Sequence, residues 1–175
     1  GADPLLSSNP NKIASADTLI LPGVGSFRNA MEKLNCSGLA DALCEAVLVR
    51  QRKILGICLG QQLMANYGEE DGGQDGLGFF EGNITRLPAM SGLRIPHVGF
   101  NTVCFDSGSR LSAGLGQSVD FYFVHSYRLG FRPAGGLVGM CEYGDNFVAA
   151  YEHENIFATQ FHPEKSQTNG LRLLS

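Results

Sequence analysis

The sequence predicts an α/β fold in which a central, mostly parallel sheet is flanked by helices and carries an antiparallel β extension. Two observations predict it. In the first half, short apolar runs alternate with segments whose apolar residues recur at helical spacing, which is typical of a parallel sheet. After the glycine-rich loop GEEDGGQDGLG, strand-like runs follow one another without helices between them, which is typical of antiparallel hairpins.

The first half divides into six predicted elements. Their apolar residues follow either the continuous pattern of a buried strand or the spacing of one helix face. Strands are expected over residues 5–8, 18–21 and 53–57, and helices over residues 27–34, 39–50 and 59–67. The segment Pro22-Gly23-Val24-Gly25 closes the second strand. Because strands separated by helices form parallel sheets, we expect helices on both faces of this sheet.

The second half is predicted to be strands joined mostly by hairpins. These strands are expected over residues 79–87, 96–105, 121–129, 138–143, 147–152 and 156–161. The clearest turn between them is Gly144-Asp145-Asn146, because glycine, aspartate and asparagine tolerate the backbone angles of tight hairpins. The antiparallel strands therefore extend one edge of the parallel sheet.

The composition indicates one globular domain over residues 1–175. Hydrophobic residues make up 43% of the chain and charged residues 17%, which is enough apolar material for a substantial core. The net charge of −4 gives no electrostatic signal for nucleic acid or for an anionic membrane. No apolar run approaches the roughly 18 residues of a membrane helix. We therefore expect neither nucleic acid nor a membrane as a partner.

The cysteines form an odd set without a C-x-x-C pair. This argues against a disulfide framework and against a zinc site, so we expect no metal and no cofactor. Free thiols fit a reducing cytoplasm best. The five cysteines are Cys36, Cys44, Cys58, Cys104 and Cys141.

The stretch KILGICLGQQL, residues 53–63, places Cys58 between a buried strand and a helix, with Gly56 and Gly60 on either side. This pattern is typical of a nucleophile elbow, in which the reactive side chain stands on a tight, strained turn and the glycines leave room for it. The N-terminus of the following helix would favour a thiolate. The alternative is a core cysteine between two turn glycines, since free cysteine is often buried.

A cysteine nucleophile needs a base, and His162 in QFHPEKS is the best placed of the four histidines. It ends an apolar strand, a proline follows it, and Glu164 lies two residues later, where its carboxylate can accept the imidazole N–H. The alternative is a structural HPE turn. His97 and His125 lie in apolar strands, where a satisfied, partly buried histidine is the default, and His153 is expected to be solvated.

The loop PGVGS, residues 22–26, lies beyond the carboxyl end of a predicted parallel strand, where ligands of such sheets bind. It matches neither G-x-x-x-x-G-K-[ST] nor G-x-G-x-x-G, so a phosphate cradle is disfavoured. Its glycines permit a peptide orientation that donates backbone N–H groups to an oxyanion. A simple tight turn is the alternative.

The motifs PGVGSF, GICLGQQ and QFHPEKS, in this order, resemble the class I (triad) glutamine amidotransferases, and the resemblance covers essentially the whole chain. G-x-C-x-G-x-Q followed about 100 residues later by H-P-E is a specific combination. Within this family the sequence is most similar to the glutaminase subunits of imidazole glycerol phosphate synthases, through IPHVGFN, YFVHSY and HPEKSQ. The resemblance implies a flavodoxin-like amidotransferase fold.

The resemblance also implies the reaction. Cys58 would attack the side-chain amide of L-glutamine, His162 would act as general base and then as general acid, and Glu164 would orient the histidine. The released ammonia would pass to a (β/α)8 cyclase partner within a heterodimer.

Further site residues follow from the same resemblance. The oxyanion hole would use the backbone N–H of Leu59 and one from the region of Gly23 and Val24. Glutamine would be held by Gln62, Glu70, Ser126 and Tyr127. The partner-facing region near the channel entry would contain His97, Gly99 and Tyr122.

Some features depart from the family pattern. Family members begin with a hydrophobic strand and a helix, and GADPLLSSNPNKI matches the part after that helix, so we expect an upstream βα unit of roughly 20 to 25 residues. HPEKSQ-NGLRLL also resembles paralogues that supply ammonia for sugar amidation in surface polysaccharide synthesis. The same residues are compatible with a stand-alone hydrolase of γ-glutamyl amides and with a non-catalytic binding subunit that keeps the fold.

Overall fold

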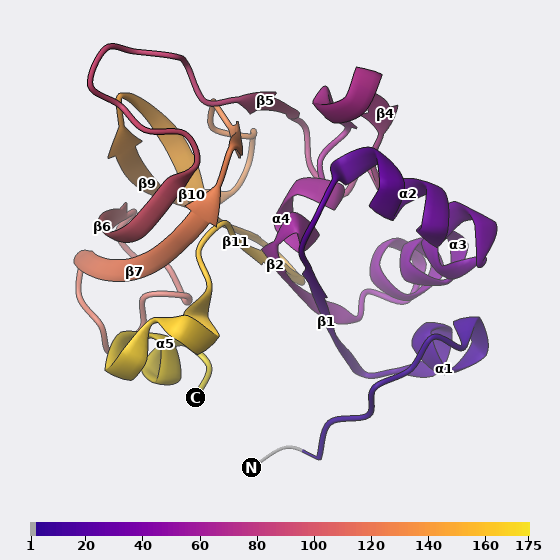
Figure 1. Ribbon diagram of the computed structural model, residues 1–175. Coiled ribbons are helices and arrows are strands. Elements are labelled where there is room, and N and C mark those ends of the chain that lie inside the picture. Colours follow the sequence, from indigo (N-terminus) through magenta and orange to yellow (C-terminus); the bar gives the residue numbers. More distant parts are fainter. Residues whose placement is uncertain (1–2) are drawn as a thin grey trace.

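The computed structural model describes residues 3–175, and its centre is a short parallel sheet (Figure 1). Strands β1 (Thr18–Gly23), β2 (Lys53–Cys58) and β11 (Ile156–Thr159) lie side by side in the order β1-β2-β11. All three run in the same direction, and the register pairs Gly23 with Cys58. The loop after β1 and the turn after β2 therefore meet at the carboxyl edge of the sheet.

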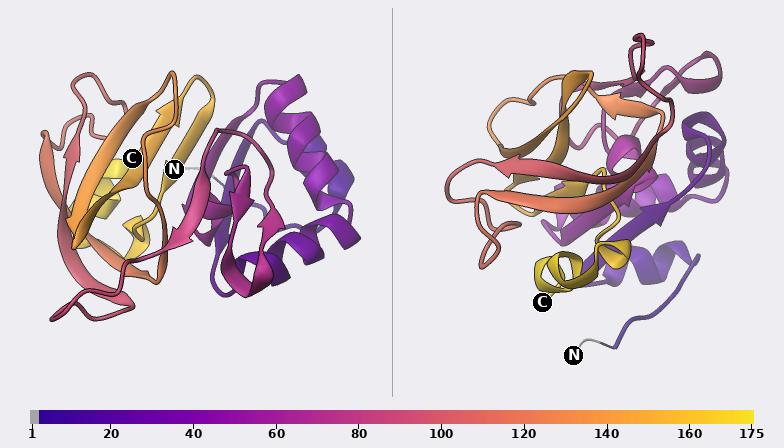
Figure 2. Two further views of the ribbon diagram at one scale, coloured as in Figure 1. Left: turned by 90° about the horizontal axis from the view of Figure 1, so that it is seen from above. Right: turned by 60° about the vertical axis from the view of Figure 1, so that its left-hand side comes forward.

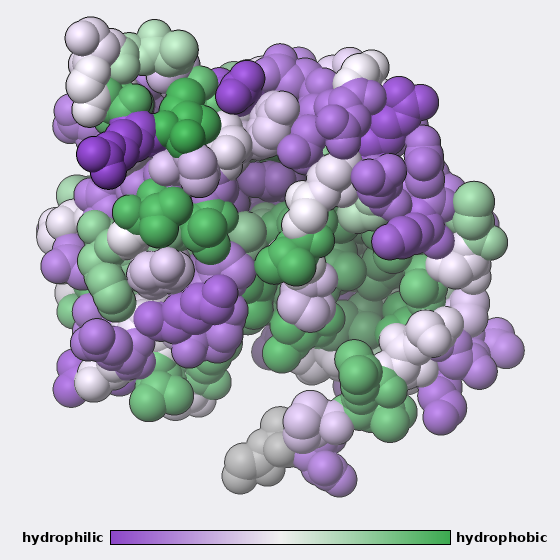
Figure 3. All heavy atoms as spheres, in the orientation of Figure 1, coloured by the Kyte–Doolittle hydropathy of each residue, from purple (hydrophilic) through white to green (hydrophobic). Residues whose placement is uncertain are grey.

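Four helical segments lie against β1 and β2. They are α1 (Pro10–Ser15), α2 (Phe27–Cys36), α3 (Leu39–Cys44), which continues as a π-helical turn over Glu45–Val49, and α4 (Leu59–Leu63). Leu19 of β1 points into the core beneath them, whereas Ile20, on the other face, is 59% exposed. Figure 3 shows apolar surface over β1 on this side. Among the described residues, the helices thus cover one face of β1, although we expected both.

The antiparallel extension joins the parallel sheet through β10 (Asp145–His153), which pairs with β11. Figure 2 shows this extension on one side of the molecule and helices α1 to α3 on the other. A last helix, α5 (Gln167–Leu173), packs against β7 and the 3-10 turn η3 (Pro163–Lys165). The remaining strands are β3 (Tyr67–Gly68), β4 (Gln74–Asp75), β5 (Asn83–Arg86), β6 (His97–Phe105), β7 (Ser118–His125), β8 (Tyr127–Leu129) and β9 (Leu137–Tyr143), with a 3-10 turn, η2 (Glu70–Gly72), between β3 and β4.

The buried apolar residues form two clusters. One lies between the helices and the parallel sheet and includes Phe27, Met31 and Ile54. The other lies inside the antiparallel extension, where Phe121 and Phe161 stack with ring centroids 3.9 Å apart. Burying side chains of this size supplies most of the driving force for folding. Neighbouring residues of β10 and of β11 belong to different clusters, so these two strands lie between the clusters.

Two of the predicted elements are wrong or too long. Residues 5–8 form no strand, because no described strand lies beside them to supply ladder hydrogen bonds. Helix α4 ends at Leu63, not at residue 67, because the backbone carbonyls of Leu63 and Met64 accept N–H groups from Leu77 and Phe79 at 2.7 and 2.8 Å. Those loop contacts replace the hydrogen bonds that would continue the helix.

Strand boundaries in the second half also differ. Phe79 and Phe80 are buried in the first core cluster, and the predicted strand over residues 79–87 is reduced to β5, which starts at Asn83. The predicted strand over residues 121–129 is split at Ser126 into β7 and β8. The turn at Gly144 between β9 and β10 is confirmed, with φ +74° at the glycine. Across residues 3–175, no helix has the length and apolarity that crossing a bilayer requires.

Candidate active site

Cys58 stands on a strained turn between β2 and α4. Its φ of 54° and ψ of −109° lie outside the regions that a side-chain-bearing residue normally adopts, and such strain concentrates at functional sites. A Cβ on Gly60 would lie 1.8 Å from the carbonyl oxygen of Leu21, and one on Gly56 would lie 2.7 Å from Sδ of Met64. The turn therefore requires both glycines, and the predicted elbow geometry is confirmed.

His162 lies just beyond β11 and is held at three points. Its Nδ1 lies 2.7 Å from Oε1 of Glu164, its backbone N–H donates to the carbonyl of Tyr122 at 2.9 Å, and its carbonyl accepts from the hydroxyl of Ser166 at 2.6 Å. Nδ1 is therefore the ring nitrogen that the carboxylate fixes. The orientation of the ring is set before any ligand binds.

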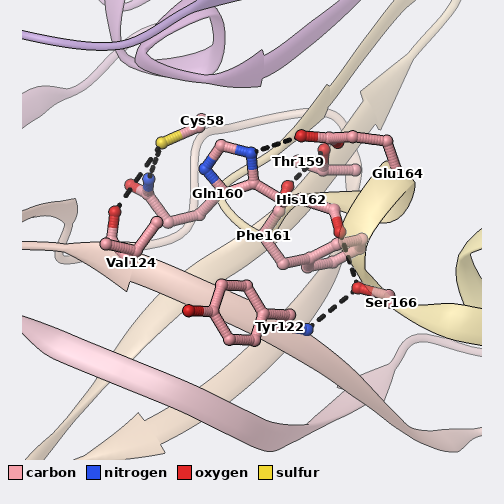
Figure 4. Close-up of polar contacts among 9 residues, drawn as sticks. All are labelled: Cys58, Tyr122, Val124, Thr159, Gln160, Phe161, His162, Glu164 and Ser166. Carbon is pink, nitrogen blue, oxygen red and sulfur yellow. Dashed lines mark hydrogen bonds and ion pairs between the residues drawn. The ribbon is translucent and has the colours of Figure 1, made fainter.

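The other ring nitrogen of His162 is buried and has no hydrogen-bond partner among the described residues. Figure 4 shows it turned to the side on which Cys58 lies, while the opposite nitrogen faces Glu164. A buried imidazole nitrogen without a partner costs free energy, so such an atom calls for an explanation. A reacting group that donates a proton to it during turnover supplies one.

Burial raises the pKa of the Cys58 thiol to about 11. The negative charge of Glu164 also raises this pKa, whereas the backbone N–H of Leu59, the positive charge of Lys165 and the side-chain amide of Gln160 lower it. The resting sulfur is therefore a thiol, and its S–H points to the carbonyl of Val124 at 4.0 Å. A nucleophile of this kind needs a nearby base that removes its proton during the reaction.

A cleft of about 500 Å³ opens over Cys58 and His162. Its volume suits a small amino acid or a similar ligand. Eight of the predicted site residues line it, from both halves of the chain. These are Val24, Cys58, Leu59, Gln62, Glu70, Ser126, Tyr127 and His162.

Two of the predicted glutamine-binding residues already have partners within the protein. The amide nitrogen of Gln62 donates to the carbonyl of Tyr127 at 2.9 Å, which leaves its amide oxygen for a ligand. One carboxylate oxygen of Glu70 accepts the backbone N–H of Phe27 at 2.7 Å at the start of α2. Both side chains are thereby oriented toward the cleft, and each keeps an oxygen that can accept a hydrogen bond.

The PGVG loop contributes Val24 and Gly25 to the lining of the cleft. Val24 is 80% exposed, and Gly25 has a φ of +106°, which a residue with a Cβ rarely adopts. Gly23 is the last residue of β1, and a Cβ there would lie 3.2 Å from Cβ of Leu59. The predicted oxyanion-hole residues Gly23, Val24 and Leu59 are therefore neighbours at the mouth of the elbow.

The predicted partner-facing residues do not share one environment. His97 is only 2% exposed, and its Nδ1 lies 3.0 Å from Nε2 of His125, so its side chain lies beneath the surface and not on it. Gly99 has a φ of +132° with open space at the Cβ position. Tyr122 is partly exposed and packs edge-on against Phe100 with ring centroids 5.6 Å apart. A partner on the exposed face of β6 would therefore contact Tyr122 and Phe100, whereas the His97 ring lies on the buried face, stacked on Phe123.

Two residues that sequence reasoning missed complete the site. Gln160 is fully buried, and its amide nitrogen lies 3.8 Å from Sγ of Cys58. The hydroxyl of Ser166 donates to the carbonyl of His162 and accepts the backbone N–H of Tyr122 at 2.9 Å. Both residues flank the HPE motif within QFHPEKS. Their position close to the predicted base is the feature of the sequence that could have identified them.

A thiol on a strained elbow, on the side of an imidazole nitrogen that has no hydrogen-bond partner within residues 3–175, is the arrangement of a cysteine hydrolase on an α/β sheet. Comparison with known proteins shows which family of such enzymes the chain belongs to. The model of the family "Glutamine amidotransferase class-I" matches residues 5–174. The chain belongs to this family, and it is a glutamine amidotransferase.

The sequences and structures of individual relatives agree with this family assignment. The chain is 45% identical over 174 residues to imidazole glycerol phosphate synthase subunit HisH 1 of Campylobacter jejuni subsp. jejuni serotype O:23/36, covering 99% of this chain and 86% of that protein. It is 44% identical over 170 residues to subunit HisH 2 of the same synthase from Vibrio vulnificus, covering 97% and 79%. A solved glutamine amidotransferase matches with a TM-score of 0.71 at 20% identity, covering 95% and 80%, which shows a shared fold.

Proposed function

We propose that this chain is the glutaminase subunit of an imidazole glycerol phosphate synthase. It hydrolyses L-glutamine to glutamate and passes the ammonia to a cyclase subunit of (β/α)8 fold in histidine biosynthesis. The identities with the two HisH proteins, which extend over nearly the whole chain, support this assignment. The observation that carries the chemistry is the buried Nε2 of His162, which lies on the side of Cys58 and has no hydrogen-bond partner among residues 3–175.

The first half-reaction forms a covalent intermediate. Sγ of Cys58 attacks the side-chain amide carbon of glutamine while Nε2 of His162 takes the thiol proton. The carbonyl oxygen becomes an oxyanion, which accepts N–H groups from Leu59 and from the Val24 region. The tetrahedral intermediate then breaks its C–N bond, His162 protonates the leaving nitrogen, and ammonia departs. A γ-glutamyl thioester remains on Cys58.

The second half-reaction regenerates the thiol. His162, again neutral, takes a proton from a water molecule, whose oxygen attacks the thioester carbon. The C–S bond breaks, the sulfur recovers a proton from the histidine, and glutamate leaves. Glu164 stabilises the imidazolium formed in both steps through its contact with Nδ1 at 2.7 Å.

The α-amino-acid group of glutamine is held at the far end of the cleft from Cys58. Glu70 attracts the α-ammonium through its charge, and the amide oxygen of Gln62 can accept one of the ammonium N–H groups. Ser126 separates β7 from β8 and Tyr127 begins β8, and at this break a backbone N–H or a hydroxyl can bind the α-carboxylate. These contacts distinguish free glutamine from a glutamine residue within a peptide.

The partner docks on the outer surface of β6 and β7. Val98, Phe100 and Val124 are exposed apolar residues on these two strands, and Tyr122 lies beside them. Exposed aromatic and aliphatic side chains in one patch are typical of an interface. The backbone of Tyr122 bonds to His162 and, through Ser166, to the carbonyl of the same histidine. A heterodimer formed here places the entry of an ammonia channel next to the site where ammonia is released.

The test is ammonia release from glutamine by the complex with the cyclase subunit, compared with the Cys58→Ala variant of the same complex. Wild type is expected to use glutamine, and the variant is expected to lose this activity while ammonia-dependent synthesis by the cyclase is retained. Stimulation by a sugar-amidating partner in place of the cyclase would support the polysaccharide paralogue. Full activity of the subunit without any partner would support a stand-alone hydrolase.

A further inference from the structure

Gln160 lies at the back of the candidate active site, in a position that ordinary packing does not require of a glutamine. It is the first residue after β11, its backbone N–H donates to the carbonyl of Ala149 at 2.7 Å, and it is fully buried. Burying a primary amide costs free energy unless its donors and acceptor find partners. The partners of this amide are Gln62 and Cys58.

The hydrogen bonds determine which end of the Gln160 amide faces the sulfur. The backbone carbonyl of Tyr127 can only accept, so the Gln62 atom 2.9 Å from it is the amide nitrogen. The same nitrogen lies 3.0 Å from the side chain of Gln160, which must therefore present its oxygen to it. The NH₂ group of Gln160 is then the end that lies 3.8 Å from Sγ of Cys58.

Cys58 thus rests between a donor and an acceptor. Its S–H points to the carbonyl of Val124, and an N–H of Gln160 points to its sulfur (Figure 4). When the proton leaves, the Val124 carbonyl no longer has a donor to accept from, whereas the N–H of Gln160, like the backbone N–H of Leu59, continues to favour the sulfur. Hydrogen bonds to an ionised acceptor are shorter and about twice as strong as those to a neutral one. The contact therefore gains strength at the step that forms the nucleophile.

We propose that Gln160 is a catalytic residue whose amide N–H donates to Sγ of Cys58 and stabilises the thiolate that His162 produces. Gln62 orients the amide, so it contributes to the nucleophile as well as to glutamine binding. A neutral donor suits this position, because Glu164 already places a negative charge near the sulfur. The direction of the Gln160 effect on the Cys58 pKa, which is downward, agrees with this role.

The inference rests on the proposed role of Cys58 as the nucleophile, and its test does not need glutamine turnover. The rate of Cys58 alkylation by iodoacetamide is measured from about pH 7 to 12 in the full chain, with peptide mapping to follow this thiol alone, so that the range includes the raised pKa of the wild-type thiol. In Gln160→Met, which has a similar size and no N–H donor, the alkylation pKa is expected to rise by about one unit, and the rate at neutral pH to fall about tenfold. Gln160→Glu, which in its ionised form brings a negative charge to the sulfur, is expected to raise this pKa further.

Gln61 offers a matched control. It is as deeply buried as Gln160, it precedes Gln62 on α4, and its amide nitrogen donates to the carbonyl of Val148 at 3.3 Å, away from the sulfur. Gln61→Met therefore removes a buried amide without removing the proposed donor, and the alkylation profile is expected to stay that of wild type. Circular dichroism and thermal unfolding establish that each variant is folded.

The outcomes separate the possibilities. A rise in the alkylation pKa in the Gln160 variants, absent in Gln61→Met, supports the donor role. The same profile in Gln160→Met and wild type would overturn it, and so would an equal shift in Gln61→Met, because the contact would then be structural. In the complex with its partner, the donor role further predicts a loss of kcat of about tenfold in Gln160→Met with KM nearly unchanged. If wild type released no ammonia from glutamine, the proposed function would fail while the alkylation result would still stand.

Discussion

Cys58 and His162 each carry a feature that a purely structural residue does not need. The cysteine has a positive φ at which glycine would be less strained, and the histidine keeps a buried nitrogen without a partner in the part of the chain that the structure describes. Each feature costs stability by itself. Together they place a nucleophile and a base at the floor of one cleft, and the surrounding hydrogen bonds of Glu164, Ser166 and Gln160 hold them there.

Glu164 is expected to act by orienting the histidine. Its carboxylate contacts Nδ1 at 2.7 Å, and its side chain is 51% exposed, so water can replace part of its effect. Glu164→Gln is therefore expected to lower kcat for glutamine by about tenfold to a hundredfold, at the low end of what acid–base groups contribute, with little change in KM. Steady-state kinetics of the complex measure both values. An unchanged kcat would show that the backbone contacts alone orient His162.

The pair His97 and His125 is expected to make the fold sensitive to acid. Burial lowers the pKa of His97 to about 4 and that of His125 to about 3. His97 also stacks on Tyr143 with ring centroids 3.8 Å apart. In the unfolded chain both histidines take up protons near pH 6.5, whereas in the folded protein they stay neutral to a much lower pH. Their contribution to stability is therefore fully present above about pH 6.5 and decreases as the pH falls toward 4.

The acid effect has a measurable slope. As the pH falls from roughly 6 to 4.5, each neutral histidine is expected to lower the free energy of unfolding by about 1.4 kcal/mol per pH unit. His97→Asn keeps an N–H near the position of Nδ1 and removes one titrating group. Urea unfolding at several pH values should then give a slope that is smaller by about that amount. The same slope in variant and wild type would mean that His97 is already protonated in the fold.

At the scale of secondary-structure elements, the prediction from sequence was most accurate where a single motif determines the local backbone conformation. The glycines around Cys58 and the proline after His162 identified the elbow and the base, because sterics at those positions leave few conformations. Boundaries that depend on distant contacts were missed. Helix α4 stops early because its carbonyls bond to the loop around Leu77, and residues 5–8 lack a described neighbour with which to form a strand. Gln160 was missed because its role depends on a sulfur 102 positions away.

The close contact between α4 and β1 predicts how much stability is lost when a methyl group is added at Gly60. A Cβ on Gly60 would lie 1.8 Å from the backbone carbonyl oxygen of Leu21, which cannot move without displacing β1. Gly60→Ala is therefore expected to cost about 3 kcal/mol of stability or more. Gly116→Ala is the matched control. It has open space at the Cβ position and a φ of +102°, so it is expected to cost only about 1 kcal/mol of backbone strain.

Chemical denaturation of both variants measures the two stability losses. Gly60→Ala is also expected to lower the alkylation rate of Cys58, because displacement of α4 moves the N–H of Leu59 away from the sulfur. Equal stability losses in the two variants would show that the backbone of β1 can shift at Leu21 at little cost in free energy. The elbow would then be less rigid than its geometry indicates.

At the scale of the whole molecule, residues of the parallel sheet and of the antiparallel extension line the same cleft. Cys58 comes from the parallel sheet, and Ser126, between β7 and β8, comes from the extension. Relative movement of these two parts would therefore change the width of the cleft. The outer strands β6 and β7, on which we place the partner, belong to the extension, so partner binding acts directly on one wall of the cleft.

The isolated subunit is expected to be nearly idle because one oxyanion donor is out of place. Val24 lies between Gly23 and Gly25, and glycines on both sides let the peptide groups of this loop take two orientations at small cost. Only one orientation aims an N–H at the oxyanion. Loss of one such donor lowers turnover by about 10²–10³. The partner with its bound acceptor would select the competent orientation, which limits wasteful hydrolysis when no acceptor is present.

This switch predicts a specific kinetic pattern. When glutamine hydrolysis by the subunit alone is compared with that of the complex plus acceptor, kcat should rise by about 10²–10³ while KM for glutamine changes little, because the donor acts only on the transition state. Cys58→Ala in the complex gives the background rate. Equal kcat values with and without the partner would mean that the loop is a rigid turn and the subunit is always active. A change confined to KM would instead place the effect of the partner on glutamine binding, at the wall formed by Ser126 and Tyr127.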